Sequence, residues 1–351
     1  MNRGHEMFEP NFRYTHPMVN NLVDIGVSRA TVLSSRLVPK WDITLRREAL
    51  VASAHASTAI EGNPLSLREV SLLAEGREVM ATRRAKHEVI NYLDVLRNLE
   101  RYHTAGRMTE EHILRLHRDI AKGVLEDPDD EGHYRDVVVV VGDPRTGHIT
   151  YRPPPPRDVP RLMREFTGWL GSDATRELDP VIAAGISHYE FVRIHPFVDG
   201  NGRTARALAT VLLASREFDI KGYFALDDFF DADRASYYRA LSNVDKHRRD
   251  LTTWLEYFTS GVLVSMSKVR ERVLELSLER RRVATEGQLA LTERQMSIVE
   301  LAVRNGRVTS KDVASKYGIS PQAAHKEIRG LVDLKVLQAR GKGKATYYVP
   351  T

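Results

Sequence analysis

Apolar side chains recur every three or four positions along most of the chain, which is the spacing of one face of an α-helix. Clear runs of this kind cover residues 83–102, 109–124 and 265–284. Glycine and proline separate such runs, for example at Gly62-Asn63-Pro64, where the helices within 42–73 must break. The pattern predicts a mainly α-helical protein.

Two short β-branched runs interrupt the helical pattern in the middle of the chain. Val137–Val141 and Ile149–Tyr151 flank a turn that contains Pro144 and Gly147. Runs of this composition around a Pro/Gly turn predict a β-hairpin. A lone hairpin in a helical protein leaves backbone donors and acceptors open. It is therefore either a structural flap or a place where an extended peptide pairs.

The chain changes character after residue 291. Thr292-Glu293-Arg294-Gln295 is a capping box that opens a helix, and Ser310–Tyr317 and the segment from Pro321 predict two more helices. Residues 337–349, with two glycines and two lysines in the middle, predict a hairpin. Three helices followed by a basic hairpin resemble a winged helix-turn-helix domain.

Composition narrows the class of protein. The chain has 351 residues, 42% of them hydrophobic, which is enough for sizeable cores. It has no cysteine, which excludes disulfides, thiolate nucleophiles and Cys-ligated zinc. No apolar run approaches the roughly 20 residues of a membrane span, and the N-terminus lacks the apolar core of a signal peptide. We therefore expect a cytoplasmic protein with no membrane segment.

Positive charge is concentrated at the C-terminal end. The net charge is +5, whereas residues 292–351 carry 11 Lys+Arg against 5 Asp+Glu, a difference of +6. The side chains expected on the exposed face of the third helix, the recognition helix for duplex DNA, are Gln322, His325, Lys326 and Arg329. On the wing, Arg340, Lys342 and Lys344 are expected to meet phosphates. Winged helices also serve in dimerisation and protein docking, so that alternative stays open.

The densest group of chemically useful residues lies at His195–Arg206. Pro196 disfavours a helical conformation at His195, so the helix that begins at Pro180 should stop there and leave the imidazole at a turn. An imidazole can accept a proton near neutral pH. Gly200 and Gly202 let the backbone bend and let an anion approach the free N–H groups at the start of the next helix.

Charged side chains flank this turn. Arg203 and Arg206 are three apart on the new helix, roughly opposite an apolar face, so both guanidiniums can reach a bound anion. Asp199 would repel a phosphate unless a divalent cation lies between them, which makes Asp199 a candidate Mg²⁺ ligand. Taken separately, a Gly-Asn-Gly turn and a solvated arginine face are the alternative interpretations of these parts.

Together, the twelve residues match the signature His-Pro-Phe-x-Asp/Glu-Gly-Asn-Gly-Arg-x-x-Arg position by position, and the chain thereby resembles the Fic (filamentation induced by cAMP) family. The resemblance implies a mostly helical fold and transfer of AMP from ATP to a protein hydroxyl, with release of pyrophosphate. It implies that His195 deprotonates the target hydroxyl, that Asp199 holds Mg²⁺ and that Phe197 is a buried anchor. The residues that it assigns to the phosphates are Gly200, Asn201, Gly202, Arg203 and Arg206.

A second match to the same family lies far upstream. Ser57-Thr58-Ala59-Ile60-Glu61-Gly62 fits the inhibitory helix motif Ser/Thr-x-x-x-Glu-Gly/Asn of Fic proteins. The resemblance implies that Glu61 pairs with Arg206 and keeps the γ-phosphate from its productive position. An exposed capping turn is the alternative interpretation. The same carboxylate could position water that removes AMP from a modified target, so the direction of net transfer stays open.

Two adjacent tyrosines complete the candidate site. Tyr237 and Tyr238 lie on a predicted helix that resembles the Tyr-Tyr-x-Ala-Leu helix beside the adenine in Fic proteins. The two rings are expected to stack on the nucleoside or bond to it, with core packing as the alternative. His188, on the helix before the signature, is interpreted as a packing histidine. Gly202 matches the AMP-transferring pattern, whereas Doc-type kinases of the family carry lysine there.

The sequence predicts four parts: an N-terminal helical region with the inhibitory motif at 1–105, a Fic catalytic core at 106–264, a linker helix at 265–291 and the winged helix domain at 292–351. The expected function is an autoinhibited, Mg-ATP-dependent protein adenylyltransferase that acts on a Ser, Thr or Tyr hydroxyl. The hairpin is expected to register the target segment. Self-modification and a homodimer are further expectations. The alternative is a DNA-binding transcriptional regulator whose Fic part senses nucleotide.

Overall fold

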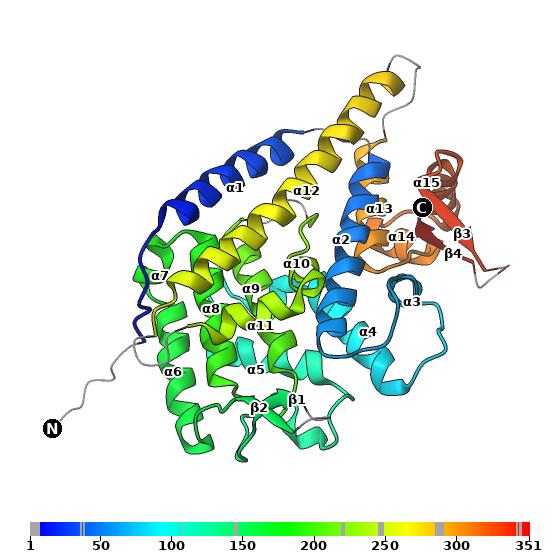
Figure 1. The fold of residues 1–351 in the computed structure, drawn as a ribbon. Coiled ribbons are helices and arrows are strands. Elements are labelled where there is room, and N and C mark those ends of the chain that lie inside the picture. Colours follow the sequence, from blue (N-terminus) through cyan, green and yellow to red (C-terminus); the bar gives the residue numbers. More distant parts are fainter. Residues whose placement is uncertain are drawn as a thin grey trace.

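A computed structural model shows a mainly helical molecule (Figure 1). It describes residues 8–35, 37, 39–105, 107–143, 147–218, 222–244, 249–284, 291–341, 343 and 346–351. The strands that it describes form two separate antiparallel pairs, β1-β2 and β3-β4. The predicted fold class, mainly α with a small β-hairpin, is confirmed.

The helices and strands follow one another along the chain within these bounds. The first part contains α1 (His16–Ser34), α2 (Pro39–Ile60), α3 (Leu67–Ala74), α4 (Arg83–Arg97), η1 (Leu99–Tyr102), α5 (Glu110–Ala121), η2 (Pro128–Asp130), β1 (Val141–Asp143) and β2 (His148–Tyr151). The middle part contains η3 (Pro156–Asp158), α6 (Val159–Leu170), α7 (Asp173–Glu177), α8 (Pro180–Ile194), α9 (Asn201–Ser215), α10 (Asp227–Ala232), α11 (Arg234–Ser242) and α12 (Thr252–Ala284). The last part contains α13 (Glu293–Arg304), α14 (Ser310–Tyr317), α15 (Pro321–Asp333), β3 (Leu337–Arg340) and β4 (Tyr347–Pro350).

Two packed helices in the centre, α8 and α9, carry the signature at their junction. Asp179 opens α8 as a cap, because its side chain accepts a hydrogen bond of 2.8 Å from the N–H of Val181. The arginine face of α9 is buried like its apolar face: Arg203 is 1% exposed and Arg206 is 2% exposed. The reason is that α2, α4 and α5 all pack against α9, so these arginines meet protein groups rather than water.

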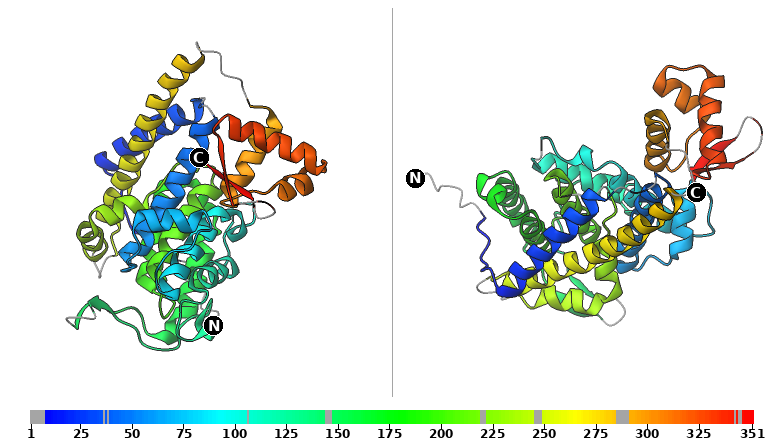
Figure 2. Two further views of the ribbon diagram at one scale, coloured as in Figure 1. Left: turned by 90° about the vertical axis from the view of Figure 1, so that its right-hand side faces the viewer. Right: turned by 90° about the horizontal axis from the view of Figure 1, so that it is seen from above.

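The longest helix, α12, runs along one side of the bundle with α1 beside it, as Figures 1 and 2 both show. Met18 and Ile25 of α1 are buried, and Asn21 donates a hydrogen bond of 3.1 Å to Thr259 of α12. The helix predicted for 265–284 is therefore the second half of a longer one. Part of the predicted linker, residues 285–290, lies outside the described residues.

The predicted hairpin in the middle of the chain is present but shorter than expected. Val141 pairs with Tyr151, and Asp143 pairs with His148. The run that begins at Val137 is not yet strand and is exposed, with Val138 at 76%. The hydroxyl of Tyr151 donates to the Arg193 carbonyl over 2.7 Å, which ties β2 to the end of α8. The predicted turn residues 144–146 lie outside the described residues.

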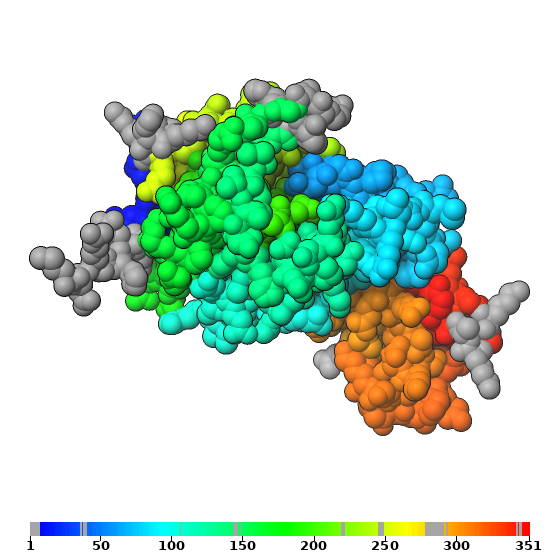
Figure 3. All heavy atoms as spheres, turned by 90° about the horizontal axis from the view of Figure 1, so that it is seen from below, coloured from blue at the N-terminus to red at the C-terminus, as the bar shows by residue number. Residues whose placement is uncertain are grey.

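Residues 291–351, here called the C-terminal unit, stand at one side of the molecule (Figures 2 and 3). The predicted capping box is present, since Thr292 accepts from the N–H of Gln295 and Gln295 accepts from the N–H of Thr292. The element order, three helices and a hairpin, is the predicted one. The unit has its own hydrophobic core, which includes Ile298, Val299, Val313, Ala324, Ile328 and Leu331.

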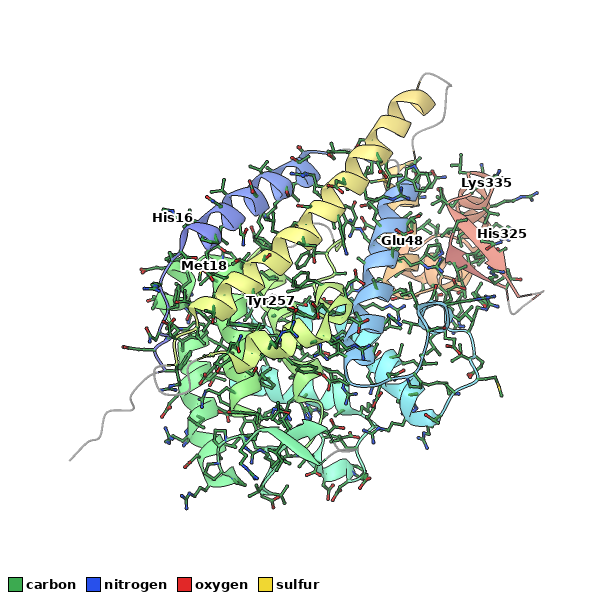
Figure 4. The ribbon with its side chains drawn as sticks, viewed as in Figure 1. His16, Met18, Glu48, Tyr257, His325 and Lys335 are labelled. Atoms are coloured by element: carbon green, nitrogen blue, oxygen red, sulfur yellow. The ribbon has the colours of Figure 1, made fainter. Side chains whose placement is uncertain are left out.

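The C-terminal unit packs on α2, the helix whose other end carries the inhibitory motif. Ile43 of α2 is buried in the core of that unit, and Arg47 donates a hydrogen bond of 3.0 Å to the carbonyl of Pro350. Figure 4 labels His325 and Lys335 on this unit, and both are exposed. None of the helices described here has the length and apolar character needed to cross a membrane.

Candidate active site

His195 lies between α8 and α9 in a left-handed backbone conformation, with φ 51° and ψ 61°. Such a conformation costs a residue other than glycine about 1–3 kcal/mol and recurs at functional sites. Pro196 ends α8 as predicted, because it disfavours a right-handed helical conformation at the preceding residue. Arg135 holds the turn: its N–H donates to the Pro196 carbonyl at 2.9 Å, and its Nε donates to the His195 carbonyl at 2.8 Å.

The imidazole of His195 is arranged to accept a proton. Its Nδ1 lies 3.2 Å from the carbonyl of Val192, and because a carbonyl only accepts, this contact assigns the proton to Nδ1. Nε2 is then the free acceptor. Burial lowers the pKa of His195 and Arg135 lowers it further, against the Val192 carbonyl, Glu61 and Asp199, which raise it. The ring is therefore neutral at pH 7 and able to act as a base.

The turn between the two helices is closed by Asn201. Its Oδ1 accepts a hydrogen bond of 3.0 Å from the N–H of Phe197, and its Nδ2 donates one of 2.9 Å to the carbonyl of the same residue. Gly200 adopts φ 77°, a left-handed conformation that glycine tolerates without strain, and caps α9. The first N–H groups of α9 thereby point toward the space in front of the helix N-terminus, and this arrangement favours binding of an anion at that end.

The same turn is supported by His117, a residue that the sequence did not single out. It accepts a hydrogen bond of 3.0 Å from the N–H of Gly132 at Nδ1, so Nε2 carries the proton and donates to the Asp199 carbonyl at 3.0 Å. Its ring stacks on Phe197, with centroids 3.6 Å apart and planes inclined by 4°. Burial lowers the pKa of His117 to about 4, so the ring stays neutral. In the sequence it is a lone histidine on a helix, which carries no signal of its own.

Both signature arginines carry buried N–H groups that lack a hydrogen bond. Within the described part of the chain, Nη1 of Arg206 has no hydrogen-bond partner, nor do Nε and Nη1 of Arg203. Buried donors are seldom left unsatisfied, since each costs about 1–3 kcal/mol. The two guanidiniums therefore fit an anion with several acceptor oxygens, such as a polyphosphate.

The structure places the upstream motif, Ser57–Glu61, beside Arg206 at the start of α9. Arg206 donates from Nη2 to Oε1 of Glu61 at 2.8 Å, and it donates to Ser57 twice, from Nε to the hydroxyl and from Nη2 to the carbonyl, each at 2.8 Å. A side chain at Gly202 would collide with Oε1 of Glu61, so the carboxylate lies directly against the first turn of α9. Glu61 thus occupies the position at the helix N-terminus that suits an anion.

A second carboxylate, unexpected from the sequence, lies behind the same arginine. Asp227 is 2% exposed, and its Oδ1 lies 3.5 Å from Nε of Arg206. Ser53 donates to Asp227 at 2.8 Å, and Tyr92 donates to it at 3.3 Å. Burial lowers the pKa of Arg206, but Glu61 and the other acidic neighbours outweigh burial and raise it. Burial raises the pKa of Asp227, against Arg206 and the hydrogen bonds, which lower it.

Asp199, the predicted metal ligand, has a side chain that is 46% exposed and is bound by arginine in this structure. Arg84 of α4 donates to its Oδ2 at 3.0 Å, and Nη2 of Arg203 lies 3.6 Å from its Oδ1. Glu88 joins the group as a partner of both arginines, at 3.2 Å and 3.6 Å. Among the described residues no group of three His, Cys, Asp or Glu could hold a metal ion. Magnesium is commonly bound by only one or two carboxylates, and phosphates and water complete its coordination shell. A single carboxylate, Asp199, fits this mode of binding.

The two tyrosines of α11 differ in their surroundings. Tyr237 is 2% exposed, its ring stacks on Phe230, and its hydroxyl lies 3.1 Å from Nε2 of His188. Tyr238 is 46% exposed, and burial of part of its ring raises its pKa, as does Glu61. Of the two rings, Tyr238 is therefore the one with a face open beside the site. His188 packs in the core as predicted, stacked on Trp254.

The site as a whole combines residues that lie far apart in the chain, from Ser57 to Asp227. The predicted residues that the structure brings together are Ser57, Glu61, His195, Asp199, Gly200, Asn201, Gly202, Arg203 and Arg206. The residues that the sequence did not single out are Arg84, Glu88, Tyr92, His117, Arg135 and Asp227.

Residues 107–213 match the model of the Fic/DOC family. Among curated proteins, the protein adenylyltransferase Fic of Drosophila grimshawi is 36% identical over 177 residues, which cover 48% of this chain and 34% of that protein. The protein of the same name from Drosophila melanogaster is 37% identical over 177 residues, covering 48% and 33%. The chain thus spans about a third of the length of the curated relatives that it matches.

Two solved structures share the fold. A Fic family protein from Desulfovibrio desulfuricans G20 covers 98% of both chains with a TM-score of 0.64 and 24% identity. Fic-1 (residues 134–508) of C. elegans covers 72% of this chain and 71% of that one, with a TM-score of 0.56 and 25% identity. The signature residues from His195 to Arg206 lie inside the matched family region. The chain therefore contains a Fic/DOC family domain, at residues 107–213.

Proposed function

We propose that this protein is a protein adenylyltransferase held in a restrained state by Glu61. The observation that carries the proposal is the position of the Glu61 carboxylate, against the first turn of α9 and 2.8 Å from Arg206, in an otherwise intact signature. The matched relatives named protein adenylyltransferase Fic support the reaction type. ATP is the substrate in this proposal, and the second substrate is a protein that presents a Ser, Thr or Tyr hydroxyl.

His195 acts as the base in the proposed reaction. Its Nε2 is the free acceptor, because Nδ1 is engaged with the Val192 carbonyl. As the hydroxyl oxygen forms a bond to the α-phosphorus of ATP, the hydroxyl proton moves to Nε2. The bond from that phosphorus to the bridging oxygen breaks, and pyrophosphate leaves with its electron pair. The product is an AMP ester of the target side chain.

The phosphates would lie at the start of α9. The backbone N–H groups of Asn201 and Gly202 favour an anion there, and the unsatisfied donors of Arg203 and Arg206 suit the β- and γ-phosphates. The N–H of Gly200, the third predicted donor, donates to Oδ1 of Asp199 at 2.6 Å in this structure. Asp199 would hold Mg²⁺, which supplies positive charge to the phosphates when bound. This metal assignment requires Arg84 to release Oδ2 of Asp199.

The exposed segment before β1 suits a peptide partner. Val137, Val138 and Val140 are exposed ahead of the hairpin, where the Val137 carbonyl accepts a hydrogen bond of 3.0 Å from Nη1 of Arg135. Tyr151 and Arg135 attach this region to the residues around His195. An extended target segment could add to the hairpin by backbone hydrogen bonds and so present its hydroxyl to His195. Tyr238 is the candidate for contact with the nucleoside.

The test is intact-mass spectrometry of the purified protein and candidate targets with Mg²⁺ and ATP. A gain of an AMP moiety, larger with E61G than with wild type and absent with H195A, supports the proposal, whether the acceptor is a target or the protein itself. A gain of a phosphate alone would favour a kinase. Loss of AMP from a modified target that depends on Glu61 would favour net removal.

A second candidate function concerns the C-terminal unit. Gln322, His325, Lys326 and Arg329 are exposed on one face of α15, and the net charge of residues 292–351 is positive. Arg340 lies on the adjoining hairpin, whereas Lys342 and Lys344 lie outside the described residues. This arrangement would suit a winged helix that binds duplex DNA, with the Fic domain as a nucleotide sensor. Salt-dependent binding to duplex DNA that K326A/R329A weakens would support it. Binding that is undetectable or insensitive to salt would favour a docking or dimerisation role.

A further inference from the structure

We infer that Asp227 is a positioning residue for Arg206 that competes with Glu61 and thereby sets how readily Glu61 leaves. The effect on activity rests on the proposed function. The competition of the two carboxylates for the Arg206 guanidinium does not depend on it. Both carboxylates reach Arg206 from distant parts of the chain. They differ in burial and in the strength with which other groups hold them.

Asp227 is the permanent partner. It is the first residue of α10, its side chain is 2% exposed, and its Oδ1 lies 3.5 Å from Nε of Arg206. Hydrogen bonds from Ser53 and Tyr92, at 2.8 Å and 3.3 Å, fix its two oxygens separately. Because Ser53 and Tyr92 lie on α2 and α4, three helices would have to separate before Asp227 could move.

Glu61 is the exchangeable partner. Its side chain is 33% exposed, it follows the last residue of α2, and Gly62 comes next with φ 90°. Arg206 is the partner that the structure gives this carboxylate, through Nη2 at 2.8 Å. Rotation of one side chain into solvent is therefore enough to remove Glu61, whereas Arg206 stays hydrogen-bonded to Ser57 and paired with Asp227 at 3.5 Å.

The consequence is that Arg206 keeps a counter-ion when Glu61 leaves. A buried arginine without one would hold its last carboxylate strongly, since an unpaired buried charge is costly. Asp227 reduces that penalty in the open state and so weakens the hold on Glu61. Removing the negative charge of Asp227 should then leave Glu61 as the remaining carboxylate that the structure gives Arg206 and make its departure into solvent more costly.

The experiment is a double-mutant cycle of wild type, D227N, E61Q and D227N/E61Q, with two readouts. The first is the affinity for a non-hydrolysable ATP analogue by calorimetry. Because the phosphate is itself an anion for Arg206, we expect D227N to raise the affinity at least fivefold in the E61Q background and to change it less than twofold when Glu61 competes. The second is unfolding in urea, where E61Q should lower the midpoint more in the D227N background than alone. This second readout needs no nucleotide and no activity.

Asp228 provides the matched control. It is the next residue of α10, its side chain is 53% exposed, and it pairs with Lys268 on the surface at 3.3 Å. D228N makes the same change of charge on the same helix and should leave both readouts unchanged. If D227N does not fold, S53A and Y92F each remove one hydrogen bond to Asp227 and should act in the same direction more weakly.

The outcomes separate the two ideas. Equal effects of D227N in both backgrounds would mean a purely structural role or an uncharged Asp227 and would overturn the inference, as would an equal effect of D228N. Coupling between D227N and E61Q in urea unfolding, without any AMP transfer by E61G, would support the competition between the two carboxylates and refute the proposed function. AMP transfer by E61G without coupling in the urea cycle would support the proposed function and refute the competition between the two carboxylates.

Discussion

Replacing Glu61 by glycine is the perturbation that tests the restrained site most directly. E61G deletes the carboxylate that lies against the first turn of α9 and leaves Arg206 bonded to Ser57 and near Asp227. The guanidinium therefore keeps its position, while Nη2 loses Oε1 of Glu61 and keeps the Ser57 carbonyl, each at 2.8 Å. We expect faster AMP transfer, because the γ-phosphate can then take the place of the carboxylate.

The geometry bounds the size of the effect. Breaking a fully buried ion pair costs about 3–5 kcal/mol, and exposed pairs contribute about 0.2–1 kcal/mol. Glu61 lies between these limits, since its side chain is 33% exposed and Arg206 retains a second carboxylate. A hydrogen bond to a charged group, at about 1.5–3 kcal/mol, is the appropriate scale. At about 1.4 kcal/mol for each factor of ten, this gives roughly a tenfold to hundredfold increase in rate.

The assay follows transfer of label from ATP labelled at the α-phosphate, with initial rates at saturating Mg²⁺ and ATP. E48Q is the matched control, because Glu48 is an exposed carboxylate on the same helix, α2 (Figure 4). H195A in the E61G background should abolish the signal. An unchanged rate with E61G, in a variant that binds the ATP analogue, would refute the reasoning that Glu61 restrains transfer.

Three further predictions follow from the surrounding residues. Burial lowers the pKa of His188 to about 3, below its unfolded value near 6.5, so the free energy of unfolding should fall as pH drops from about 6.5 toward 3. H188F should reduce that slope by about 1.4 kcal/mol per pH unit, measured by urea titrations at several pH values. R84Q frees Oδ2 of Asp199 and should lower the Mg²⁺ concentration for half-maximal activity about two- to fivefold, with an unchanged value counting against Asp199 as the ligand. G202A places a methyl group against Glu61 and should cost about 1–3 kcal/mol of unfolding free energy, less in the E61G background; equal costs in both would contradict the contact.

Local signals in the sequence were sufficient for several of the helix boundaries. Asp179 and Pro180 begin α8, and Pro196 ends it at His195, because caps and proline act on the backbone within a few residues. The capping box at Thr292 behaves in the same way. The first strand of the β1-β2 hairpin was predicted too long, because β-branched composition does not tell which residues find a pairing partner.

The arginine face of α9 shows where local reasoning stops. The spacing of Arg203 and Arg206 placed them on one side of a helix, and an exposed face was one interpretation. Both are buried, because α2, α4 and α5 pack around α9. Spacing along one helix carries no information about which other helices cover it.

What the sequence by itself determined was the signature at His195–Arg206, the upstream Ser57–Glu61 motif and the mainly helical fold, since each depends on residues that are close together in the chain or on a matched pattern. Only the tertiary structure decided that Asp227 lies behind Arg206 and that His117 supports the turn at Asp199. The physical reason is that these contacts join side chains from different helices, whose meeting depends on how the whole bundle packs.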